Sequence, residues 1–388
     1  MSTPYDVLVV GGRVAGASTA MLLARAGARV ALVERSAYGS DTVSTHGLMR
    51  AGVLQLSRWG LLDTLTAAGT PPIRETTFHY SDREAQQVTI RAKGGVDALY
   101  APRRQVLDRI LVDAAADAGA DVRHRTAVTM LLRDESGRVT GAHVQDRAGR
   151  TADLQARLTI GADGIRSVVA SAVDAPVVRR GESRSAILYR YYAGLRTAGF
   201  EWAYAPGAGA GFLPTNEELT CVFVATTPVR MRALRRGGAE EAFATLLTET
   251  GLAERVLSAE PTGRLHGWAG AAGFMRQSGG PGWALVGDAG YYKDPITTHG
   301  MTDGLRDAEL LTAAILRSPE AVALTQYQAT RDELSRRFFD ATESVASYAW
   351  SMDEVRLLLR EVSSAMGDEV EHLQSLPSAL LQARGAGL

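Results

Sequence analysis

Hydrophobic residues near the start of the chain follow the pattern of two buried strands with a helix between them. Tyr5 to Val10 is a continuous apolar run, which is typical of a strand buried on both faces. Small and apolar residues recur at helical spacing from Gly16 to Ala26, and Gly27 follows as a C-cap. Arg29 to Val33 is a second apolar strand, closed by Glu34. Together these residues predict a β-α-β unit of a parallel sheet.

The remaining pattern predicts that this unit is interrupted by a different sheet and completed late in the chain. Residues 185–226 are aromatic, β-branched and separated by Gly or Pro, which indicates a mostly antiparallel sheet. Helices are expected at 47–59, 103–118, 232–258 and 320–380. Strands are expected at 74–90, 121–132, 138–145, 152–160 and 283–286.

The turn between the first strand and the first helix has the chemistry of a pyrophosphate site. It consists of Gly11, Gly12, Arg13, Val14, Ala15 and Gly16. Gly11 permits a tight reversal, Gly16 permits close packing, and the free N–H groups of the helix favour an anion. Glu34 lies at the expected distance along the chain to accept ribose hydroxyls. A turn without ligand is the alternative, and it leaves Glu34 unexplained.

Arg13 occupies the position of the middle glycine in the usual G-x-G-x-x-G pattern. Its backbone N–H is still available, so the substitution does not abolish the site. The guanidinium either pairs with a phosphate oxygen or is solvated, and we favour the phosphate contact.

Charge and composition exclude several classes of protein. The 388 residues carry a net charge of -1, which gives no support to nucleic acid as a partner. The only cysteine, Cys221, excludes an intramolecular disulfide and leaves a cysteine zinc site unsupported. We expect no metal site, no signal peptide, no membrane span and a cytoplasmic location.

Two later motifs indicate which dinucleotide would bind. "GADGIRS", 161–167, and "GDAGYYKDPITTHGMTDGL", 287–305, each follow an apolar strand. With the first turn, they resemble the para-hydroxybenzoate hydroxylase-like FAD-dependent monooxygenases, which are related to flavin-dependent halogenases and geranylgeranyl reductases. The resemblance covers most of the chain through these three separated motifs.

The resemblance implies an α/β fold in which a discontinuous Rossmann-like FAD-binding domain holds an inserted, mostly antiparallel substrate sheet and ends in a helical tail. We expect FAD-binding parts at 1–73, 101–180 and 276–330, β-rich substrate parts at 74–100 and 181–275, and the helical region at 331–388.

FAD contacts follow from the same resemblance. The first turn would hold the pyrophosphate, Glu34 the ribose and Asp288 the ribityl chain, with the N–H groups of Gly300 and Met301 near the pyrimidine edge of the flavin. The other implied FAD contacts are Arg35, Arg50, Arg104, Val128, Asp163, Gly164, Gly287 and Pro295. For three of these residues a local role is the alternative: Asp163 in a turn, Arg50 in solvent and Asp288 as a cap.

Departures from the family pattern bear on the electron source and on halogenation. Ala170 stands where the aspartate-glycine motif ordinarily continues to an arginine, which weakens the case for direct NAD(P)H binding. Electrons would come from NAD(P)H that binds transiently or from a partner flavin reductase, and Ala170 slightly favours the reductase. No W-x-W-x-I-P pattern is present, which argues against halogenation.

Hydroxylation needs a dry pocket, because the C4a-hydroperoxide formed by reduced FAD and oxygen otherwise loses hydrogen peroxide. Substrate contacts are expected from Arg190, Tyr192, Trp202, Phe212 and Phe223, although alternation along the strands would direct half of the sheet's side chains into a core. The candidate catalytic residues are His46, Tyr292, Thr298 and His299. A histidine with a pKa near neutrality would deprotonate a phenol, although local hydrogen bonding explains either histidine equally well.

The sequence therefore predicts an FAD-dependent monooxygenase that uses oxygen to hydroxylate an aromatic or polycyclic small molecule. Two alternatives remain: an FAD-dependent reductase of prenyl-type double bonds, and a flavin-binding protein without catalysis.

Overall fold

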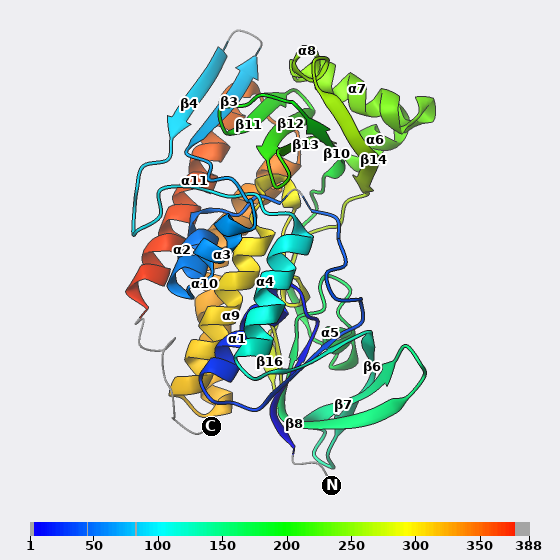
Figure 1. Ribbon diagram of the computed structural model, residues 1–388, viewed down its shortest axis with the longest axis vertical. Coiled ribbons are helices and arrows are strands. Elements are labelled where there is room, and N and C mark those ends of the chain that lie inside the picture. The colour runs from blue at the N-terminus through cyan, green and yellow to red at the C-terminus, as the bar shows by residue number, and fades with distance from the viewer. Residues whose placement is uncertain (1–3, 45, 82–83, 377–388) are drawn as a thin grey trace.

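The computed structural model describes residues 4–44, 46–81 and 84–376. It contains two large sheets at opposite ends of the long axis, with helices between them (Figure 1). This arrangement confirms the predicted α/β fold with a parallel, Rossmann-like part and a second, mostly antiparallel sheet. The last residues of the helix expected at 320–380 lie outside the described residues.

The first sheet contains the predicted β-α-β unit. Its strands are β1 (Tyr5–Val10), β2 (Val30–Glu34), β5 (Asp121–His124), β8 (Thr151–Gly161), β16 (Gly279–Gly280) and β17 (Trp283–Leu285), in the order β16-β17-β8-β1-β2-β5. Strand β1 is parallel to both neighbours, with Val7 opposite Val30 and Leu158. Two further strands, β6 (Thr126–Arg133) and β7 (Val139–Asp146), extend the sheet through antiparallel pairing. The single strand expected at 121–132 is divided because Arg125 adopts a left-handed conformation, with φ of 54°.

Three helices from distant parts of the chain pack together beside this sheet. Helix α1 (Val14–Arg25) contacts α4 (Arg104–Asp117) and α9 (Gly300–Arg317). A Cβ atom on Gly304 would lie 3.2 Å from Cβ of Ala15, so this glycine allows α9 to approach α1 closely. Smaller helices complete this part: α2 (Arg50–Arg58), α3 (Leu62–Ala67) and α5 (Val168–Ala172).

The second sheet is antiparallel except where β11 runs parallel to β3. Its strands are β3 (Glu75–Ser81), β4 (Glu84–Thr89), β10 (Ala186–Ala193), β11 (Phe200–Ala205), β12 (Ala208–Pro214), β13 (Leu219–Thr226) and β14 (Glu260–Trp268), in the order β14-β10-β13-β12-β11-β3-β4. The expected helix at 232–258 is instead α6 (Pro228–Leu234), α7 (Ala239–Glu249) and α8 (Ala253–Val256). Gly238, with φ of 116°, separates α6 from α7.

The carboxyl-terminal helices connect the two sheets. Helix α10 (Glu320–Ala346) and α11 (Met352–Ser375) pack on each other, and both contribute to the core beneath the second sheet. A third, small sheet consists of β9 (Val177–Arg180), β15 (Phe274–Arg276) and β18 (Tyr291–Tyr292). In the part of the chain that the structure describes, no helix has the length and hydropathy required to cross a bilayer.

Candidate functional site

The turn from β1 into α1 depends on its glycines. Gly11 has φ of 104°, and a Cβ atom there would lie 2.5 Å from the carbonyl oxygen of Ala162. A Cβ atom on Gly16 would lie 1.8 Å from the carbonyl oxygen of Gly11. The first hydrogen bond within the helix runs from the N–H of Ala17 to the oxygen of Arg13. The N–H groups before Ala17 therefore lack helical acceptors, as an anion site requires.

Arg13 already has a protein partner beside this turn. Its guanidinium forms an ion pair with Asp108 at 2.9 Å and donates to the backbone oxygen of Ser40 at 3.2 Å. Arg104 binds the same carboxylate at 3.2 Å from one helical turn away. The phosphate contact of Arg13 and the flavin-side contact of Arg104 stay predictions, in which a ligand would compete with Asp108. The i, i+4 spacing of Arg104 and Asp108 was the only sequence signal for this arrangement.

Glu34 lies at the end of β2, in contact with the turn. Its carboxylate accepts the N–H groups of Gly12 and Ser36, each at 2.7 Å. Burial alone would raise the pKa of Glu34, but these two donors, the Ser36 hydroxyl and the charge of Arg13 together hold the pKa below its ordinary value. Glu34 is therefore ionised, with lone pairs left for a ribose hydroxyl.

Three other predicted FAD contacts have ordinary surroundings. Arg35 is exposed, and Val128 is half-buried in β6. Arg50 begins α2 and donates to the backbone oxygen of Val96 at 2.7 Å. Their FAD contacts stay predictions.

Asp163, followed by Gly164, combines a turn role with a free oxygen. One carboxylate oxygen accepts the N–H of Val168 at 2.6 Å, while the other is buried without a partner among the described residues. Burial raises the pKa of Asp163. Ala170, where the family pattern has arginine, is buried and supplies no positive charge.

Asp288 and the start of α9 border an open space. In the part of the chain that the structure describes, the Asp288 carboxyl has no hydrogen-bond partner, and burial, reinforced by Asp303, raises its pKa to about 7. A Cβ atom on Gly300 would have only the Asp288 carboxyl oxygen within reach, at 4.0 Å. The first hydrogen bond within α9 runs from the N–H of Asp303 to the oxygen of His299. The N–H groups of Gly300 and Met301 therefore have no acceptor within the helix. A polyol and a flavin ring edge fit these groups.

We use the term flavin loop for residues 293–299, between β18 and α9. Pro295–Thr297 forms a 3-10 turn, and Thr298 adopts a left-handed conformation with φ of 52°. A Cβ atom on Gly47 would lie 2.2 Å from the methyl group of Thr298. This close approach places His46 beside the flavin loop. Gly287 anchors the preceding turn by donating to Asp307 at 3.0 Å.

His46 lies in an aromatic environment. Its Nε2 is 2.5 Å from the hydroxyl of Tyr191, and the two rings stack with centroids 5.7 Å apart. Burial, followed by the charges of Arg103 and Arg104, lowers the pKa of His46 to about 3. The expectation of a histidine pKa near neutrality is therefore wrong for His46, because the ring is fully removed from water.

The two faces of the second sheet separate the predicted substrate residues. Trp202 and Phe223 point toward the flavin loop and the carboxyl-terminal helices, in one core with Tyr189 and Tyr191. Three predicted contacts, Arg190, Tyr192 and Phe212, lie on the opposite face beside α7. Arg190 there forms an ion pair with Glu240, and the two aromatic rings join a second core. The prediction that these three residues contact the substrate is therefore corrected, since strand residues alternate between faces.

The sequence did not predict that Tyr189, Tyr191, Arg103 and His266 gather around His46. The guanidinium of Arg103 lies 4.1 Å from the centre of the Tyr191 ring, and His266 stacks on Tyr189 at 4.9 Å. The sequence signal for the two tyrosines was their i, i+2 spacing, which places both on the same face of a strand. Tyr292, by contrast, packs against Phe274 in the small sheet, with ring centres 5.9 Å apart.

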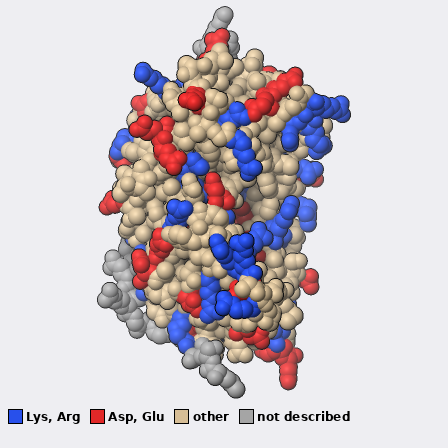
Figure 2. All heavy atoms as spheres, turned by 45° about the vertical axis from the view of Figure 1, so that its right-hand side comes forward, with Lys and Arg blue, Asp and Glu red and all other residues tan. Residues whose placement is uncertain are grey.

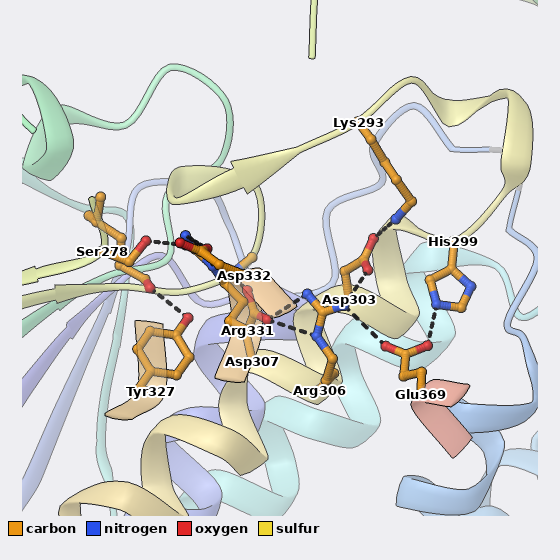
Figure 3. Close-up of polar contacts among 12 residues, drawn as sticks. Ser278, Lys293, His299, Asp303, Arg306, Asp307, Tyr327, Arg331, Asp332 and Glu369 are labelled. Carbon is orange, nitrogen blue, oxygen red and sulfur yellow. Dashed lines mark hydrogen bonds and ion pairs between the residues drawn. The ribbon is translucent and has the colours of Figure 1, made fainter. Parts of the chain in front are cut away.

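His299 lies in an ionic environment instead (Figure 3). Its Nε2 is 2.6 Å from a carboxylate oxygen of Glu369, which reaches in from α11. His299, Asp303 and Glu369 bring ligand-type atoms within 4.8 Å of one another, a grouping that the sequence did not indicate. Lys293 and Arg306 already bind the carboxylates of this grouping.

Charges of both signs cover the surface. On the face shown in Figure 2, acidic and basic side chains are mixed, and basic side chains gather near the middle. This mixture agrees with the net charge of -1.

Comparisons with known proteins point to one family. Residues 4–342 match the family described as FAD binding domain. The digeranylgeranylglycerophospholipid reductase of Methanoculleus marisnigri is 34% identical over 169 residues, covering 42% of this chain and 39% of that protein. The menaquinone reductase of Mycolicibacterium smegmatis is 29% identical over 335 residues, covering 81% of this chain and 78% of that protein. The chain spans about two fifths of the length of the first curated relatives that it matches.

Solved structures show the likeness of fold. A triple mutant of the flavin-dependent brominase Bmp2 superposes with a TM-score of 0.79 at 17% identity, covering 97% of this chain and 96% of that one. PqsL of Pseudomonas aeruginosa, described as "a probable FAD-dependent monooxygenase", gives a TM-score of 0.78 at 22% identity, covering 94% of this chain and 100% of that one.

Proposed function

The chain belongs to the FAD binding domain family and is an FAD-dependent oxidoreductase, and from this premise we propose that it hydroxylates an aromatic or polycyclic small molecule with oxygen. Bound FAD would supply the redox chemistry, passing electrons to oxygen and one oxygen atom to the substrate. The chain's own residues bind, orient and desolvate the reactants.

In this proposal the cofactor follows the free polar groups of the site. Its pyrophosphate lies at the first turn of α1, its ribose at Glu34 and its polyol at Asp288. The ring edge lies at the N–H groups of Gly300 and Met301. The surroundings of Gly300 support this placement, because a Cβ atom there would have only the Asp288 carboxyl oxygen near it, at 4.0 Å, apart from its chain neighbours.

The pair formed by His46 and Tyr191 is the observation that carries the proposed hydroxylation. Nδ1 of His46 is buried without a partner among the described residues, beside the flavin loop and the aromatic face of the second sheet. In the tautomer that carries its proton on Nε2, His46 donates to Tyr191, and its Nδ1 lone pair accepts a phenolic O–H. A neutral imidazole can accept a hydrogen bond from the phenol at Nδ1 while it donates to Tyr191 at Nε2. The pair thus orients a phenol without holding a net charge.

A second candidate is a reductase of prenyl-type double bonds. The observation that favours it is sequence similarity to digeranylgeranylglycerophospholipid reductases and to a menaquinone reductase. A prenyl chain has no polar atom to satisfy the buried Nδ1 of His46, and an unsatisfied polar group is costly. The site geometry therefore favours a phenolic substrate.

The electron donor belongs to the same proposal. NAD(P)H would bind transiently, or a partner flavin reductase would deliver reduced FAD. Buried Ala170 supports the partner reductase, because that position offers no positive charge to the phosphates of NAD(P)H. Anaerobic mixing with NADPH or NADH would bleach the flavin only in the first case.

An oxygen-labelling experiment separates the candidate reactions. The FAD-loaded protein would be reduced with dithionite and mixed with ¹⁸O₂ and a panel of phenols, polycyclic aromatics and prenylated quinones. Hydroxylation predicts products that carry one ¹⁸O atom. A saturated prenyl product without label, formed equally well without oxygen, would contradict the proposal and establish the reductase.

A further inference from the structure

Charged side chains border the aromatic environment of His46 on the side that is accessible to solvent. Asp41 and Arg264 are exposed, whereas Arg103 and His266 are partly exposed. We call these four residues the charged rim. Burial lowers the pKa of His266, the charges of Arg264 and Arg103 lower it further, and Asp41 opposes them. Residues from β14, the start of α4 and the segment after β2 therefore act on one another here.

Arg103 has only loose ion pairs within this group. Its guanidinium lies 3.5 Å from the carboxylate of Asp41 and 3.8 Å from that of Glu217. The two acids are 41% and 66% exposed, so water weakens both pairs. The guanidinium also lies over the ring of Tyr191, a cation–π contact that occupies no hydrogen-bond acceptor. Arg103 thus keeps donors that a stronger acceptor could use.

Tyr191 connects Arg103 to the proposed site of the phenol. Its hydroxyl is 2.5 Å from Nε2 of His46, and the centre of its ring is 4.1 Å from the Arg103 guanidinium. Because one tyrosine contacts both groups, a single aromatic ring system can span the distance between them. A planar carboxylate matches the fork of guanidinium donors better than other anions of similar size.

We propose that the substrate is an aromatic hydroxy acid, whose carboxylate binds Arg103 at the charged rim in place of Asp41 while its hydroxyl bonds His46. This inference rests on the proposed hydroxylation and names the class of its substrate. Arg103 then determines specificity, since a neutral phenol leaves it with its two long ion pairs. Arg264 adds to the attraction of an acid toward the rim.

The test measures how strongly the FAD-loaded protein prefers an acid to its uncharged amide. The probes are hydroxylated benzoates and naphthoates, each compared with its own carboxamide, which has a similar shape without the charge. Dissociation constants would come from the change in flavin absorbance or from calorimetry. In at least one pair the wild-type protein should bind the acid about thirtyfold more tightly, and Arg103→Met should abolish this preference.

Arg190→Met is the matched control. The side chains of Arg190 and Arg103 are 14% and 12% exposed, and Nε of each lacks a partner within the ranges that the structure describes. Arg190, however, lies on the opposite face of the second sheet and pairs closely with Glu240. Arg190→Met should keep the preference for the acid. A wild-type protein without this preference in any pair, or its persistence in Arg103→Met, would overturn the inference.

Asp41→Asn covers the case in which Arg103→Met does not fold. Removing the competing carboxylate should tighten binding of the acid about threefold relative to the amide, and an unchanged or smaller ratio would overturn the inference. Products that carry ¹⁸O from neutral phenols, without preference for any acid, would overturn the inference but leave the proposed function intact. Acid binding that depends on Arg103, together with saturated products free of label, would instead contradict the hydroxylation itself.

Discussion

Two histidines lie at the flavin loop, His46 beside it and His299 as its last residue, and their surroundings differ. His46 and His299 are each 1% exposed, so burial does not distinguish them. His46 stacks on Tyr191, and the charged groups that affect its pKa are cations. His299 bonds Glu369 within a group of carboxylates. We call these regions the aromatic side and the ionic side.

The difference lies in the partners: burial and nearby cations lower the pKa of His46, whereas His299 contacts a carboxylate. A neutral ring on the aromatic side can exchange hydrogen bonds with a substrate hydroxyl. The ring on the ionic side instead contacts Glu369 through Nε2. The same residue type thus has different partners around one loop.

The largest expected effect comes from breaking the ionic side. Arg306→Met leaves three buried carboxylates without their shared guanidinium, and removing one partner from such a group costs about 3–5 kcal/mol. Arg337→Met is the control, because Arg337 forms exposed pairs with Glu361 and Asp368. Denaturant unfolding should show a large loss only for Arg306→Met. Similar midpoints for the two variants would mean that the cluster contributes no more than a surface ion pair.

A pH experiment tests the low pKa of His46 on the aromatic side. The pKa of His46 is about 3 in the folded protein, against about 6.5 in an unfolded chain. Between these values the unfolded chain binds more protons, so stability falls as the pH falls, by about 2 kcal/mol at pH 5. His46→Asn should remove this part of the acid sensitivity, and asparagine tolerates the φ of 65° at this position.

The control for that experiment is His299→Asn. It should not flatten the dependence of stability on pH between 7 and 5. A wild-type slope in the His46 variant would indicate that His46 is already charged in the folded protein.

Removing one hydroxyl tests whether the aromatic side orients the substrate. Tyr191→Phe leaves Nε2 of His46 without its partner and should lower turnover of a phenolic substrate about tenfold, the effect of losing one hydrogen bond of about 1.4 kcal/mol. Tyr192→Phe, on the other face of the same strand, should stay within about twofold of wild type. Equal losses in the two variants would sever the link between the Tyr191 hydroxyl and the reaction.

The smallest expected effect separates the two faces of the second sheet. Phe223 and Phe212 are both buried but point to opposite faces. Phe223→Leu should raise the KM of an aromatic substrate about threefold, whereas Phe212→Leu should leave KM unchanged and cost less than about 1.5 kcal/mol of stability. If Phe212→Leu alone raises KM, the substrate binds on the α7 side.

Local features of the site could be predicted from the sequence. The glycines of the first turn and the acid at Glu34 act within one β-α-β unit, so their spacing alone determines their neighbours. The antiparallel sheet was likewise evident from its aromatic and β-branched residues. The register that assigns each strand residue to a face was not, because it depends on which strands pair.

Contacts between distant segments could not be predicted. Glu369 is 70 residues from His299, and no spacing rule connects them. Tyr191 is 145 residues from His46, and their contact depends on how the second sheet rests on the flavin loop. The pKa of His46 was misjudged for the same reason, since burial is a property of the folded chain.

Nitrogen NMR of the FAD-loaded protein with ¹⁵N-labelled histidine tests the comparison most directly, with His46→Asn and His299→Asn used to assign the signals. At pH 5 the account predicts one protonated ring nitrogen in His46, because its pKa is about 3. Two protonated ring nitrogens in His46 at pH 5 would contradict it.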